Sequence, residues 1–119
     1  MATRNEVRDR AANDLGLLML GQSLQAQDST RILAGYDEVY ASLKKDGLAT
    51  WASTAEVPDE VVPYMVTLVA HNCLNVYGVS VERYNRIMLL AGTNGEVARG
   101  EIRRLVKPDY VSMDDPTDY

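Results

Sequence analysis

The stretch Pro58–Tyr77, "PDEVVPYMVTLVAHNCLNVY", is the most apolar part of the chain and decides the predicted fold. Pro58, followed by two acids, is typical of the first turn of a helix, while Pro63 either kinks that helix or moves its start later. The apolar residues fall on nearly all faces of a helix that runs to about Tyr77. A helix apolar on all faces is buried on all faces. We therefore expect it to be the central element, covered by other helices or by other subunits.

Two helices are predicted before this element. The first begins at Thr3, where "TRNE" has the form of a capping box, and ends at Gly16. The second runs from about Ala26 to Lys45, with apolar residues three and four apart. Gly47 suits the left-handed position after its last turn, and Leu48 would then fold back onto that turn.

A last helix is predicted from Ser80 to about Val106. Gly92 and Gly95 lie inside it, where they either break the helix or let another backbone approach closely. The sequence shows no convincing strand and no repeat. The predicted class is all-α, a four-helix antiparallel bundle-like subunit with an extended C-terminal tail.

The charge of the chain divides it into two parts. Its 119 residues fit one domain and carry a net charge of −5. Residues 108–119 contain four aspartates and no lysine or arginine, so residues 1–108 carry only about −1. This predicts a helical domain at 1–107 and an acidic extended tail at 108–119 that orders on a partner. It also argues against tight nucleic-acid binding, which needs clustered cations.

Candidate catalytic and metal-binding residues are few. His71 and Cys73 are two positions apart, so they do not share a helix face, and no cluster supplies further ligands. We predict no catalytic residue, no cofactor and no metal. One cysteine forms no intrachain disulfide, which together with an N-terminus that lacks a signal-peptide pattern favours folding in the cytoplasm. The longest apolar run has 10 residues, too few to span a membrane.

Three arginines, Arg99, Arg103 and Arg104, lie near the end of the last predicted helix. They fit a DNA-recognition helix, intersubunit salt bridges, or a solvated helix end whose cations suit the dipole. Pairs of Glu96 with Arg99 and of Glu101 with Arg104 would also be three residues apart on one helix face.

The order of these segments resembles a known family. "AANDLG", "SLQAQDSTRILAGYDEVYASLKKDGLATW", "VPDEVVPYMVTLVAHNCLNVYGVS" and a last helix ending in "RRLV" together resemble the head-to-tail connector (adaptor) proteins of tailed phages, especially the tail accessory factors of short-tailed phages. The likeness spans residues 3–107.

The resemblance implies a structural virion protein at the head–tail interface, not an enzyme. Such proteins form a homo-oligomeric ring, expected here as a dodecamer of about twelve copies, below the portal protein. The ring extends the DNA channel, helps retain packaged DNA, and passes double-stranded DNA without sequence readout during ejection. It also offers a platform for tail or nozzle proteins. By the same resemblance the C-terminal segment reaches the portal or a neighbouring subunit, which points to Tyr110, Val111, Met113 and Tyr119.

Trp51 raises a separate question, because the only tryptophan lies in the loop that follows "LKKDG". Trp51 and Leu48 would anchor a subunit contact or dock on the portal or tail, since tryptophan is enriched at interface hot spots. Alternatively, Trp51 folds back onto its own core. Two competing functions also remain at this point: a small helical DNA-binding regulator and a small cell-wall hydrolase.

Overall fold

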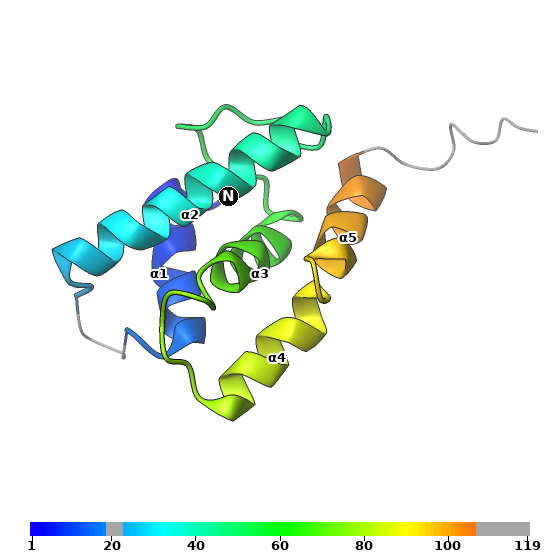
Figure 1. The fold of residues 1–119 in the computed structure, drawn as a ribbon. Helices are drawn as coiled ribbons and strands as arrows, with labels where there is room; N and C mark the ends of the chain where they lie inside the picture. The colour runs from blue at the N-terminus through cyan, green and yellow to red at the C-terminus, as the bar shows by residue number, and fades with distance from the viewer. Residues whose placement is uncertain (19–22, 107–119) are drawn as a thin grey trace, which may run out of the picture.

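The computed structural model describes residues 1–18 and 23–106, which form five α-helices (Figure 1). Their bounds are α1 Arg4–Leu15, α2 Ala26–Lys45, α3 Val62–Asn72, α4 Val81–Ala91 and α5 Glu96–Val106. The one β feature among these residues is an isolated antiparallel bridge between Ala2 and Val57. The all-α class is therefore confirmed. None of these helices combines the length and the apolar character that crossing a membrane requires.

α3 lies at the centre of the molecule, as predicted, and packs against α1, α2, α4 and α5 (Figure 1). Its buried side chains point to several sides of the helix: Val62, Met65, Val66, Leu68, Val69 and Ala70. Helices of the same chain cover them. The apolar character of α3 therefore does not require a second subunit.

α3 is shorter than predicted at both ends. It begins at Val62 rather than near Pro58 because Pro63 lies in its first turn, where the missing amide proton costs nothing. The residues before it form a separate turn, in which the Val62 amide donates to the Pro58 carbonyl (3.1 Å). The helix ends at Asn72, and turns rather than helix carry the chain to Tyr77.

The ends of α1 are those that the sequence predicts. The Thr3 hydroxyl accepts from the Glu6 amide (3.1 Å), and the Thr3 amide donates to the Glu6 carboxylate (2.8 Å). Gly16 ends the helix with φ of 84°, a conformation that favours glycine. The capping box and the glycine stop are thus both confirmed.

α2 also matches its predicted range, and its end directs the chain back to the core. Gly47 has φ of 75°, and the Leu48 amide donates to the Leu43 carbonyl (2.8 Å). The Leu48 side chain is fully buried. This tight turn begins the loop that contains Trp51.

The last predicted helix is divided into α4 and α5 at Gly92 and Gly95. Both glycines have positive φ (88° and 77°), so the helix is broken there. A β-carbon at Gly95 would lie 3.0 Å from a methyl group of Leu68 in α3, so this glycine also permits close approach to the central helix. α5 begins again at Glu96, whose carboxylate accepts from the Asn94 amide (2.7 Å).

Candidate functional site

Trp51 and Leu48, the two anchors considered from the sequence, lie in the core of their own chain. Trp51 is 6% exposed and Leu48 is fully buried. The Trp51 indole nitrogen donates to the Tyr36 hydroxyl (3.3 Å), and the Trp51 carbonyl accepts from the Tyr40 hydroxyl (2.6 Å). The Tyr40 ring meets the indole edge-on, with centroids 6.0 Å apart. Neither residue offers a surface for a partner, so the structure shows the alternative in which Trp51 folds onto its own core.

Two of the three arginines are engaged within the chain. Arg99 donates to the Ser42 hydroxyl (3.0 Å) and forms an ion pair with Asp46, which ties α5 to the end of α2. It does not pair with Glu96, whose carboxylate caps the start of α5 instead. Arg104 pairs with Glu101, as the spacing predicts. Arg103 is exposed on α5. The other predicted contact residues, Tyr110, Val111, Met113 and Tyr119, lie outside the described residues.

His71 and Cys73 have different surroundings in the fold. The His71 Nε2 atom lies 3.1 Å from the Thr93 carbonyl, in the turn between α4 and α5. Cys73 is buried. Within residues 1–18 and 23–106, the side chains of His, Cys, Asp and Glu nowhere gather in a group of three that could hold a metal ion.

The Cys73 thiol is predicted to react slowly in the native protein. Burial, followed by the negative charge of Glu38, raises the pKa of Cys73 to about 11, from an ordinary 9.0. At pH 8 the thiolate fraction is then about 100-fold lower than in the unfolded chain, and iodoacetamide should alkylate Cys73 at least that much more slowly. Mass spectrometry over time, with and without denaturant, measures both rates. Equal rates would show that the thiol is accessible in the native state.

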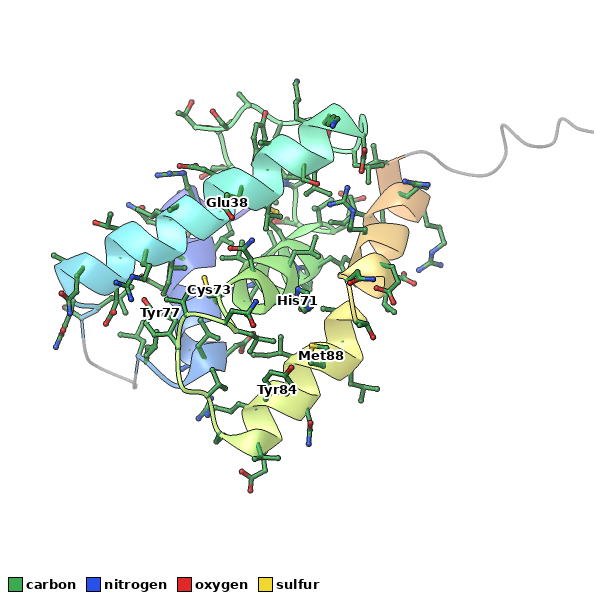
Figure 2. The ribbon with its side chains drawn as sticks, in the orientation of Figure 1. Glu38, His71, Cys73, Tyr77, Tyr84 and Met88 are labelled. Atoms are coloured by element: carbon green, nitrogen blue, oxygen red, sulfur yellow. The ribbon has the colours of Figure 1, made fainter. Side chains whose placement is uncertain are left out.

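The described surface carries unpartnered apolar side chains on α4. Val81 is 73% exposed and Leu89 is 80% exposed, and Tyr84 is also exposed. Val81, Tyr84 and Met88, of which Met88 is partly buried, recur three and four residues apart on one side of α4, beside the side that faces the core through Ile87 and Ala91, and Leu89 lies further round the helix on its outward face. We call Val81, Tyr84, Met88 and Leu89 the α4 stripe. Figure 2 shows Tyr84 and Met88 together on the viewer's side of α4.

The sequence contained a signal for this stripe. Residues 87–91 read "IMLLA", and five consecutive apolar residues cannot all face one side of a helix. At least one of them must point away from the core, and here both Leu89 and Leu90 are exposed. Val97 and Leu105 on α5 are exposed as well.

A polar notch of about 320 Å³ lies on the same face, between α2, the end of α3 and the start of α5. Figure 2 shows Glu38 and His71 there, on the viewer's side with Tyr84 and Met88. Several of its polar groups already have partners in the chain. Asn72 Nδ2 donates to Glu38 Oε1 (3.2 Å), and Arg99 is held by Ser42 and Asp46. The α4 stripe, rather than this notch, is therefore the better candidate for binding a partner.

Comparison with protein-family models, with curated proteins and with solved structures found no match.

Proposed function

We propose that this protein is a structural subunit of the head-to-tail connector of a tailed phage. About twelve copies would close into a ring below the portal protein, extend the DNA channel and help retain packaged DNA. Residues 108–119 would reach the portal or a neighbouring subunit through Tyr110, Val111, Met113 and Tyr119. The antiparallel arrangement of the four predicted helical segments and an extended form of this tail belong to the same proposal.

The α4 stripe is the observation that supports assembly best. A fully buried valine, leucine or methionine side chain contributes about 1.5–3 kcal/mol relative to an exposed one. Val81 and Leu89 lack most of this stabilisation in the single chain, because both side chains are largely exposed. A ring contact joins two different surfaces of each copy, so an apolar stripe of this kind suits one side of such a contact.

The arginines favour a structural role over DNA readout. Arg99 and Arg104 are each paired with a carboxylate of the same chain, which leaves less positive charge on α5 for phosphates. Residues 1–108 carry a net charge of only about −1. A channel lined by subunits of this charge would let double-stranded DNA pass without sequence readout.

The test is assembly measured with and without the stripe. Native mass spectrometry of the full chain, alone and with the purified portal ring, should show a high-order cyclic species. The substitution Leu89→Asp should weaken that species by about tenfold or more, because it places a charge in an apolar contact. The control is Gln27→Asp, which adds the same charge at an exposed position of α2.

Three results would count against the proposal. If the full chain stayed monomeric both alone and on the portal, the proposed ring would be wrong. If Leu89→Asp and Gln27→Asp weakened the cyclic species equally, the α4 stripe would not be part of the subunit contact. A salt-dependent shift of DNA mobility without assembly would favour the DNA-binding alternative instead.

A further inference from the structure

An open hollow lies on another side of α2, away from α5. It has a volume of about 820 Å³ and is lined by Arg4, Asp37, Tyr40, Ala41, Lys44, Lys45, Ser53 and Thr54. Three of these residues are cationic and one is acidic. Arg4 and Asp37 neutralise each other through two short contacts (2.7 and 2.8 Å). We call this the basic hollow.

Lys44 and Lys45 give the basic hollow its charge. Both are exposed in the last turn of α2, and neither forms an ion pair with a carboxylate of the described residues. The carbonyl end of a helix carries only about half a negative charge, which two ammonium groups exceed. The hollow is therefore positive overall, and Tyr40 and Ala41 add apolar surface to its lining.

The chain itself contains a segment with complementary chemistry. Residues 108–119 combine four aspartates with Tyr110, Val111 and Met113, and they contain no cation. They follow α5, which the Arg99 contacts with Ser42 and Asp46 hold against the end of α2. Figure 1 shows the last turn of α5 beside that end.

The length of this segment is sufficient to reach the hollow. Twelve extended residues span about 40 Å, whereas a helix with its side chains is only about 10–12 Å across. A tether of this length also gives the segment an effective concentration near the millimolar range for a site on its own chain. Its own chain is therefore favoured over a second copy.

We propose that the acidic segment 108–119 binds the basic hollow of its own chain in the free subunit, with its aspartates facing Lys44 and Lys45. The contact holds the segment back until a partner displaces it. The contact between segment and hollow is measured on the monomer and does not depend on the identity of that partner. The experiment can therefore contradict this contact without contradicting the connector proposal, and the reverse also holds.

The experiment uses Trp51 as an energy-transfer donor. Trp51 is the only tryptophan, and its ring contacts Tyr40, which lines the hollow. The substitution Tyr119→Cys, labelled with a dansyl acceptor, reports the position of the segment in the full chain, while the buried Cys73 thiol stays unlabelled. Transfer should be high at low salt and fall by about half or more at about 0.5 M salt, where screening shortens to a few ångströms. It should not change on dilution.

Charge variants test the partners. K44E/K45E should lower transfer at low salt to the high-salt value, whereas R10E/R31E, with the same change in net charge on exposed residues of α1 and α2, should not. The charge-swapped variant, in which K44D/K45D is combined with D114K/D115K, should restore energy transfer at low salt to the value of the unchanged protein. The proposal is overturned if K44E/K45E has no effect, if R10E/R31E acts equally, or if the swap fails to restore transfer. Transfer that falls on dilution would assign the contact to two copies and overturn it as well.

Discussion

Replacing Trp51 with alanine is expected to lower the stability of the monomer by about 3–5 kcal/mol. The indole is 6% exposed, so its removal leaves a cavity between α2 and the loop that follows it. The Tyr36 hydroxyl also loses the indole N–H that donates to it. In a domain of this size, such a loss lowers the melting temperature by more than about 10 °C.

The control for this prediction is Trp51→Phe. It keeps an aromatic ring in the core and removes the hydrogen bond to Tyr36, so we expect it to cost about half as much or less. Circular dichroism melting of the monomer at low concentration measures both variants. If Trp51→Ala left the monomer melting unchanged but abolished assembly, the tryptophan would be an interface anchor rather than a core residue.

Placing a leucine at Gly35 is expected to destabilise the protein by about 2 kcal/mol or more. A β-carbon there would lie 2.9 Å from the Asn72 Oδ1 atom and 3.1 Å from the Cys73 Sγ atom. Asn72 is exposed and can move, but Cys73 is buried and cannot move without repacking the core. The overpacking should exceed the helix propensity that leucine adds, which is at most about 1 kcal/mol.

Gly100→Leu is the matched control, because Gly100 lies in α5 with open space where a β-carbon would point. There the same substitution should stabilise the protein by up to about 1 kcal/mol. Urea unfolding of the two variants should therefore move the midpoint in opposite directions. A stabilising shift at both positions would show that Gly35 is not a packing contact between α2 and α3.

The helix ends that the sequence predicts best are those that depend on neighbouring residues alone. The capping box at Thr3 needs only Glu6, and the turn at Gly47 needs only the backbone that precedes it. The end of α3 was predicted less well, because residues 73–77 keep the apolar pattern of a helix while they form turns.

The site was harder to predict than the fold because burial depends on contacts between distant segments. Trp51 lies in a loop by sequence, and only its contacts with Tyr36 and Tyr40 place it in the core. Arg99 had a carboxylate three residues away, but it pairs with Asp46, which is distant in sequence. The α4 stripe was visible in the sequence as "IMLLA", but which of these residues face the core depends on how α4 rests on α3.

The central position of α3 affects how the subunit unfolds locally. Because α3 packs against the four other helices, its amide protons can exchange with solvent only when most of the fold opens. α4 and α5 lie at one side of the molecule and are joined by a glycine-containing turn (Figure 1). We therefore expect amide exchange to be slower in α3 than in α4 and α5, the pair of helices on which the exposed stripe lies.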